Sequence, residues 1–170
     1  MKHPHCPNCG TSFVRVTRHE GTMERILGHL KIVPFRCQLC AMRFRTFWSV
    51  SPNATQAVDR REYRRLPSSF QARMLADNSL RTETRVTDIS MGGCTIESTA
   101  SLPRGTFLEL LITPASSEEA IKVDTAMVCS SRKESMGIRF LELMGPDKHR
   151  LSQVVLSLLV GQNIPPNFVS

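Results

Sequence analysis

Four arginines lie within six consecutive positions after the first third of the chain, at Arg60, Arg61, Arg64 and Arg65. Each guanidinium is planar and permanently charged, so it can pair with two phosphate oxygens, bond the O6 and N7 edge of guanine, or stack on an aromatic ring. Pro67 follows Leu66, and a proline disfavours helical backbone in the residue before it. We therefore expect these arginines on a loop or at the start of a strand.

A second group of candidate binding residues lies downstream, between two strand-like runs. The sequence from Val86 to Ile96 predicts two strands joined by a polar corner that contains Gly92 and Gly93. The carboxylate of Asp88 can accept hydrogen bonds from the N1 and N2 donors of guanine, and the Ser90 hydroxyl can bond a phosphate or a base edge. The glycines would let the backbone approach a ligand closely. Together with the arginines, these residues suit a guanine nucleotide.

In this order, the two groups resemble the two-part motif of the PilZ domain family, whose members bind cyclic dimeric GMP (c-di-GMP). The first part would be Arg61-x-x-x-Arg65 and the second Asp88-x-Ser90-x-x-Gly93, within a resemblance that covers residues 59 to 161. It implies a β-barrel that carries the ligand on its surface. In that site Arg61 and Arg65 would clamp guanine edges and phosphates, and the residues of the second part would form the opposite wall.

The resemblance also implies a role for Arg60, which stands directly before the motif. Some receptors of the family carry an apolar residue there, whereas an arginine favours binding of a stacked pair of dinucleotides. Considered without the resemblance, the arginines also fit a solvated basic linker. Residues 88–93 likewise fit an ordinary tight turn in which an aspartate bonds its own backbone.

Four cysteines form two Cys-x-x-Cys pairs, Cys6 with Cys9 and Cys37 with Cys40. Two such pairs are typical of one tetrahedral zinc site with four thiolate ligands and Zn–S bonds of about 2.3 Å. Because cysteine would fill all four positions, we expect Zn²⁺ with a structural role, in a zinc ribbon. A redox pair would normally occur singly in a larger fold, and disulfides are disfavoured in the cytoplasm.

The chain divides by composition into a zinc ribbon over residues 1–48, a polar linker over 49–58 and a PilZ-like domain over 59–170. In the ribbon we expect strands over residues 13–17 and 43–48 and a helical turn over 24–30. Mutual repulsion of the arginines predicts that residues 49–65 are mobile without ligand.

Alternating apolar residues in the last segment predict six short strands, over residues 68–75, 80–88, 93–97, 107–112, 121–130 and 136–140. Strands of this length and spacing are typical of an antiparallel barrel. Apolar residues at helical spacing from Leu151 to Leu159 predict a C-terminal α-helix that ends at Gly161. The expected fold class is therefore mainly β: a small zinc ribbon, then a six-stranded antiparallel PilZ-like β-barrel with a C-terminal α-helix. Cys94 and Cys129 lie within expected strands and are interpreted as buried thiols.

The formal net charge is +7, and residues 1–50 hold eight of the 22 basic residues but only two of the 15 acidic ones. The basic excess therefore belongs to the ribbon and favours acidic partners. No apolar stretch like a signal peptide opens the sequence, and the longest apolar run, residues 154–160, is too short to span a bilayer. We expect a cytoplasmic protein without membrane insertion.

The resulting hypothesis is a receptor, not an enzyme, that binds c-di-GMP and relays its occupancy to an unidentified protein partner through reorientation of the ribbon. One alternative is a nucleic-acid-binding zinc-ribbon protein with a non-catalytic barrel. It draws on the basic ribbon and on the alternating basic and aromatic residues from Arg43 to Trp48, although a half-buried strand gives the same alternation. A third possibility is a protein adaptor that has kept the motif without binding the ligand.

Overall fold

The computed structural model describes residues 4–48, 62–76, 80–97, 102–114 and 119–161 of the chain. The chain forms two compact units, which meet in the sequence between Arg64 and Arg65, and the second unit runs from Arg65 to Leu159. In the part of the chain that the structure describes, no helix has the length and apolar character needed to cross a membrane.

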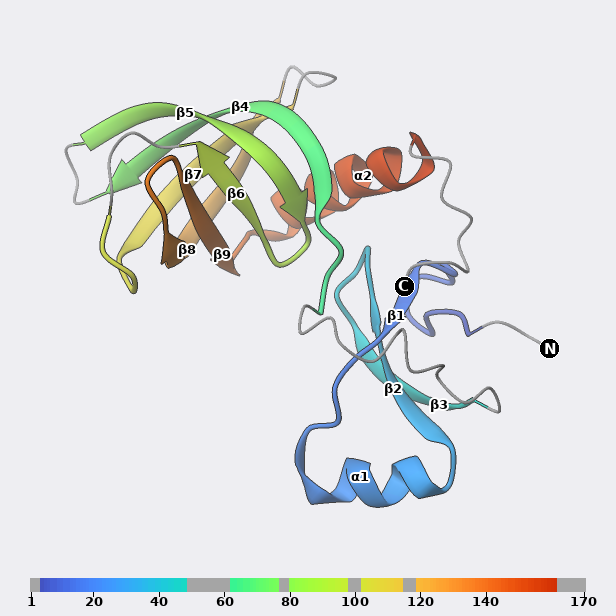
Figure 1. Ribbon diagram of the computed structural model, residues 1–170. Helices are drawn as coiled ribbons and strands as arrows, with labels where there is room; N and C mark the ends of the chain where they lie inside the picture. The colour runs from blue at the N-terminus through green and yellow to red at the C-terminus, as the bar shows by residue number, and fades with distance from the viewer. Residues whose placement is uncertain (1–3, 49–61, 77–79, 98–101, 115–118, 162–170) are drawn as a thin grey trace. The chain divides into compact units, whose positions relative to one another are not determined.

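The N-terminal unit is built on an antiparallel sheet in the order β1-β2-β3 (Figure 1). Its elements are β1 (Val14–Val16), α1 (Gly21–His29), β2 (Ile32–Cys37) and β3 (Arg43–Phe47). Phe35 of the central strand is buried, stacks on Phe44 and meets Trp48 edge-on, with both pairs of ring centroids 5.9 Å apart. The expected strands and helical turn are present, whereas β2 was not predicted.

A buried carboxylate ties α1 to the sheet. The side chain of Glu24 is 2% exposed, and its oxygens lie 2.7 Å from guanidinium nitrogens of Arg43 and of Arg45 on β3. Burial raises the pKa of Glu24, but a hydrogen bond from the Glu20 amide and the two arginines lower it more, so the pKa lies below its ordinary value. The basic residues of β3 therefore serve the ribbon's own structure.

The second unit is a closed barrel of six antiparallel strands in the order β4-β5-β6-β9-β8-β7, which confirms the predicted architecture (Figure 1). Its strands are β4 (Leu66–Ala76), β5 (Leu80–Ser90), β6 (Gly93–Glu97), β7 (Phe107–Thr113), β8 (Ile121–Ser131) and β9 (Ser135–Glu142). Fully buried side chains from all six strands fill the interior, among them Met74, Val86, Ile96, Ile112, Val123 and Met136.

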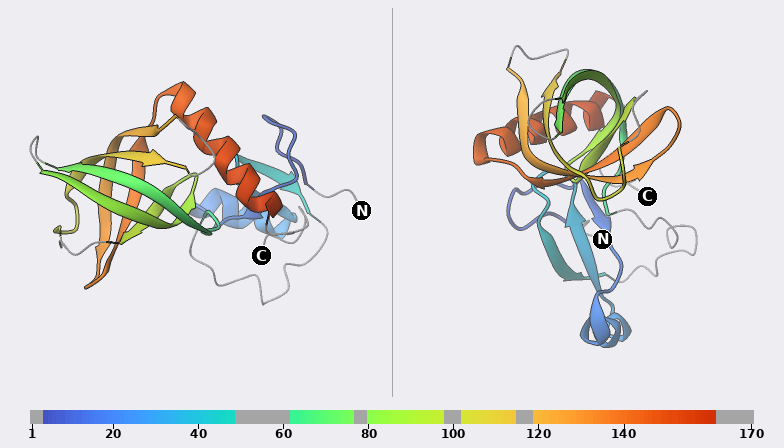
Figure 2. Two further views of the ribbon diagram at one scale, coloured as in Figure 1. Left: turned by 90° about the horizontal axis from the view of Figure 1, so that it is seen from above. Right: turned by 90° about the vertical axis from the view of Figure 1, so that its left-hand side faces the viewer.

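Helix α2 (Gly145–Gly161) follows the last strand and lies beside one end of the barrel (Figure 2). It buries Leu151, Val155 and Leu159, which recur every four residues and form one apolar face. In its first turn, Asp147 Oδ1 accepts a 3.0 Å hydrogen bond from the Lys122 amide of β8. The predicted C-terminal helix is therefore present and is anchored to the barrel.

Candidate functional site

The Sγ atoms of Cys6, Cys9, Cys37 and Cys40 form one cluster in which all lie within 4.8 Å of one another. The Cys6–Cys40 sulfurs are 3.5 Å apart and the Cys9–Cys37 sulfurs 3.6 Å. In a tetrahedral site with Zn–S bonds of 2.3 Å, neighbouring sulfurs are about 3.8 Å apart. The cluster therefore has nearly the dimensions that a zinc ion requires.

The two Cys-x-x-Cys loops share two features of their backbone conformation. The amide of Cys6 bonds the carbonyl of Thr11 at 2.8 Å, and the amide of Cys37 bonds that of Met42 at 2.9 Å, five residues on in each case. The residue after the second cysteine adopts a left-handed conformation in both loops, at Gly10 (φ 70°) and at Ala41 (φ 64°). The loops thus present their two thiols alike, as a tetrahedral site needs.

In the second loop, two backbone amides donate hydrogen bonds to the sulfur of Cys37. The Leu39 and Cys40 amides each lie 3.4 Å from Cys37 Sγ. Burial raises the pKa of the Cys37 thiol. Burial opposes ionisation of Cys40 as well, but hydrogen bonds from Asn8, the Met42 backbone and neighbouring thiols lower its pKa to about 7. A bound zinc ion would hold all four thiols as thiolates.

On the barrel, Arg65 meets Asp88 and Thr95. The guanidinium Nη1 of Arg65 donates to Thr95 Oγ1 at 2.5 Å and lies 3.4 Å from Asp88 Oδ1. Arg65 precedes β4, and Asp88 of β5 is paired in register with Thr95 of β6. Arg65 keeps 38% of its side chain exposed and Asp88 26%. Sequence reasoning missed Thr95, because only the register of the β5–β6 hairpin sets it opposite Asp88.

Ser90 and Gly93 build the turn between β5 and β6. Ser90 is 6% exposed, and its hydroxyl donates to the Gly93 carbonyl at 3.0 Å and accepts from the Gly92 amide at 3.4 Å. A Cβ on Gly93 would lie 2.1 Å from the carbonyl oxygen of Ile138. Glycine is therefore required there for close packing of β6 on β9, and both residues shape the corner that carries Asp88.

Two of the sequence-predicted arginines, Arg60 and Arg61, lie outside the described residues, and their roles stay predictions. The next residues, 62–64, belong to the N-terminal unit. The Arg64 amide bonds Gln38 Oε1 at 2.9 Å. The expectation of a mobile segment up to Arg65 is therefore wrong for these residues, because the buried side chain of Gln38 bonds their backbone.

A family model described as the PilZ domain matches residues 59–157. Among solved structures, the chain is similar to the PilZ domain with c-di-GMP of YcgR from Escherichia coli, at 15% identity and a TM-score of 0.50, over 62% of this chain and 95% of that one. It is also similar to K. pneumonia MrkH in its complex with c-di-GMP, at 14% identity and a TM-score of 0.54, over 88% of this chain and 78% of that one.

A third similar structure is the Bacillus subtilis inhibitor of motility MotI/DgrA, at 19% identity and a TM-score of 0.53, over 71% of this chain. The match covers 55% of that protein's chain, so this chain accounts for about half of its length. The search of curated proteins found no match. At identities below 20%, the similarity to these solved structures concerns the fold alone.

Proposed function

The chain belongs to the PilZ domain family, and from this membership we propose that it is a receptor for c-di-GMP, bound on the outer surface of the barrel. The contact of Arg65 with Asp88 and Thr95 carries this proposal, because it brings both parts of the motif together on neighbouring strands. Two of the similar structures, YcgR and MrkH, contain c-di-GMP, which supports the same ligand here.

The chemistry of the site suits a cyclic dinucleotide. Arg65 has five N–H donors and keeps 38% of its side chain exposed, so it can bond a phosphate or a guanine edge while its present contacts hold it in place. The carboxylate of Asp88 is partly exposed and can accept from guanine N1 and N2. We propose that Arg61, together with Arg65, binds guanine edges and phosphates, and that Arg60 helps to bind a second, stacked dinucleotide. Ser90 and Gly93 shape the wall of the site.

The four cysteines support a structural zinc site in the ribbon. Their spacing, the two matching loops and the sulfur distances all fit one tetrahedral ion. Its role is to hold together a unit too small to be stable on its own apolar core.

The receptor acts by changing the orientation of the ribbon, with residues 1–48 as the ribbon, 49–58 as the linker and 59–170 as the ligand-binding domain. A dianionic ligand bound by arginines that lie in the sequence between the ribbon and the barrel would limit the orientations that the ribbon can adopt. A protein partner would bind the ribbon in these remaining orientations. Fluorophores on the ribbon and on α2 test this relay, which requires that ligand changes their distance distribution in wild type and not in Arg61→Ala.

Salt dependence separates the receptor from the nucleic-acid-binding alternative. A ligand with two phosphates should lose little affinity as salt rises, whereas a protein that neutralises many backbone phosphates loses affinity steeply. Titration of c-di-GMP and of duplex DNA at low and high salt should therefore give measurable, weakly salt-dependent binding of the dinucleotide. Tight DNA binding with a steep salt slope and no dinucleotide binding would favour the alternative. Arg43 and Arg45, both bound to Glu24, speak against it.

A further inference from the structure

Gln38 lies inside the second cysteine loop, and its side chain is 2% exposed. A buried amide requires hydrogen-bond partners, and Gln38 takes two of them from a distant stretch of backbone. Its Nε2 donates to the carbonyl of Glu62 at 3.1 Å, and its Oε1 accepts from the amide of Arg64 at 2.9 Å. The Gln38 side chain is thus hydrogen-bonded to the backbone of the first and the last residue of the stretch 62–64.

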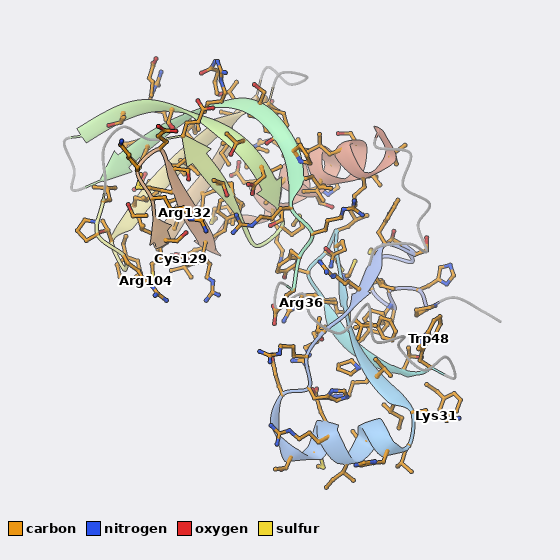
Figure 3. The ribbon with its side chains drawn as sticks, viewed as in Figure 1. Lys31, Arg36, Trp48, Arg104, Cys129 and Arg132 are labelled. Atoms are coloured by element: carbon orange, nitrogen blue, oxygen red, sulfur yellow. The ribbon has the colours of Figure 1, made fainter. Side chains whose placement is uncertain are left out.

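Arg36 of β2, labelled in Figure 3, contacts the side chains of two residues in the same stretch, Glu62 and Tyr63. Its Nε lies 3.1 Å from a carboxylate oxygen of Glu62. Its Nη1 donates to the Tyr63 hydroxyl at 3.2 Å, and its guanidinium carbon lies 5.5 Å from the centre of the Tyr63 ring. Three consecutive residues are therefore fixed to the ribbon by both backbone and side chains.

These three residues are the interval between the two arginines of the motif. Arg61 precedes Glu62, and Arg65 follows Arg64 directly. Arg65 is the residue that contacts Asp88 and Thr95 on the barrel. The ribbon thus holds the connecting residues of the ligand motif, and a residue flanked by metal-ligating cysteines makes two of the contacts.

We propose that Gln38 is a positioning residue that couples metal in the cysteine cluster to binding of c-di-GMP; the inference rests on the proposed function. Metal bonds to Cys37 and Cys40 fix the loop between them and so fix Gln38. Without metal the loop can open and release residues 62–64. The ligand must then order the motif arginines itself, which costs conformational entropy and lowers affinity.

Coupling of this kind is reciprocal. If zinc raises the affinity for c-di-GMP, then c-di-GMP raises the affinity for zinc by the same factor. Gln38→Met keeps the size of the side chain but removes both hydrogen bonds. The matched control is Gln71→Met, on the exposed side of β4.

The first experiment titrates the full-length protein with c-di-GMP before and after removal of zinc by a chelator. Chelation should weaken binding by wild type and by Gln71→Met about tenfold, the equivalent of two lost hydrogen bonds. Zinc-loaded Gln38→Met should already bind about tenfold more weakly, and chelation should add little. Saturating c-di-GMP should raise the zinc affinity of wild type by the same factor. Equal c-di-GMP affinity of wild type with and without zinc would overturn the proposal.

The second experiment needs no ligand and so separates this inference from the proposed function. Hydrogen exchange of the Arg64 amide reports its bond to Gln38 directly. The amide should be protected in the zinc-loaded wild type and lose protection in Gln38→Met or on chelation. Protection unchanged by chelation would contradict the coupling even if c-di-GMP binds. Loss of protection without any c-di-GMP binding would disprove the receptor function, and the coupling to ligand with it, but would still show that metal in the cysteine cluster holds residues 62–64 through Gln38.

Discussion

The guanidinium of Arg65 donates a 2.5 Å hydrogen bond to the hydroxyl of Thr95, a residue outside the recognised motif. This bond runs from Arg65, directly before β4, to Thr95 on β6, and it fixes the arginine beside Asp88. A ligand that needs Arg65 in one orientation then loses little side-chain entropy on binding.

Removing the Thr95 hydroxyl should therefore weaken c-di-GMP binding without changing the fold. Thr95→Val keeps the shape of the side chain but leaves Arg65 without this acceptor, and we expect a loss of about threefold to tenfold in affinity. Calorimetric titration measures it. Thr113→Val, at an exposed position of β7, is the matched control. Identical affinities for both variants would mean that Thr95 does not position the arginine.

Zinc content tests the cysteine cluster. The purified protein should carry one zinc ion per chain. Cys37→Ser should lose it, because the substitution removes one metal ligand and the sulfur that accepts two N–H···S hydrogen bonds. Amide exchange over residues 4–48 should then increase, since metal binding supplies the folding free energy of the ribbon. Cys129→Ser on β8 should keep its zinc. A zinc-free wild type, or an equally protected Cys37→Ser ribbon, would disprove the structural-zinc proposal.

Exchanging glycine for alanine in one cysteine loop and alanine for glycine in the other should change the stability of the ribbon in opposite directions. Ala41 adopts φ 64° and Gly10 φ 70°, and a Cβ on Gly10 would meet nothing within 4 Å. Only backbone strain is therefore at stake. Gly10→Ala should destabilise the zinc-bound ribbon by about 1 kcal/mol, and Ala41→Gly should stabilise it by a similar amount, because in both exchanges the left-handed strain of alanine outweighs the entropy that glycine gains in the unfolded chain. Denaturant unfolding measures both, and two changes of the same sign would refute the symmetry.

Neutralising Glu24 should destabilise the ribbon at neutral pH. Glu24→Gln removes the charge opposite Arg43 and Arg45 and should cost on the order of 1–3 kcal/mol. The folded pKa of Glu24 is lowered, so its contribution is present above the ordinary glutamate pKa and is lost as pH falls through the folded value. The difference in unfolding free energy between wild type and variant should therefore shrink in acid. Exposed Glu134→Gln is the control, and a pH-independent difference would argue against the ion pairs.

The barrel was predictable because strict alternation sets one face of a strand toward a core. Ile121 and Val123 are buried, whereas Lys122 between them is exposed, as the pattern requires. Strand β2 was missed because it lacks this signal. Its residues Val33, Pro34 and Phe35 are all buried as the centre of a three-stranded sheet, and proline within a run argues against a strand.

The candidate site was predictable only in part. Resemblance to a known motif identified Arg65 and Asp88, and the structure brings them together. Thr95 depends on strand register, which no local pattern specifies. Gln38 depends on where a stretch 24 residues later returns to the cysteine loop. Contacts of that range follow from the tertiary fold.

The central claim is that this chain binds c-di-GMP through the arginine held beside Asp88, and calorimetric titration of a matched pair of variants tests it most directly. Arg65 lies 3.4 Å from Asp88, and Arg73 on β4 lies the same distance from Glu83, with both arginines well exposed. Only the first pair belongs to the motif.

Wild type should bind c-di-GMP, with two dinucleotides per barrel if Arg60 recruits the second. Arg65→Ala should lose about tenfold to a hundredfold in affinity, the usual cost of a charged hydrogen bond, and Arg73→Ala should bind like wild type. No binding by wild type, or equal losses in the two variants, would contradict the account.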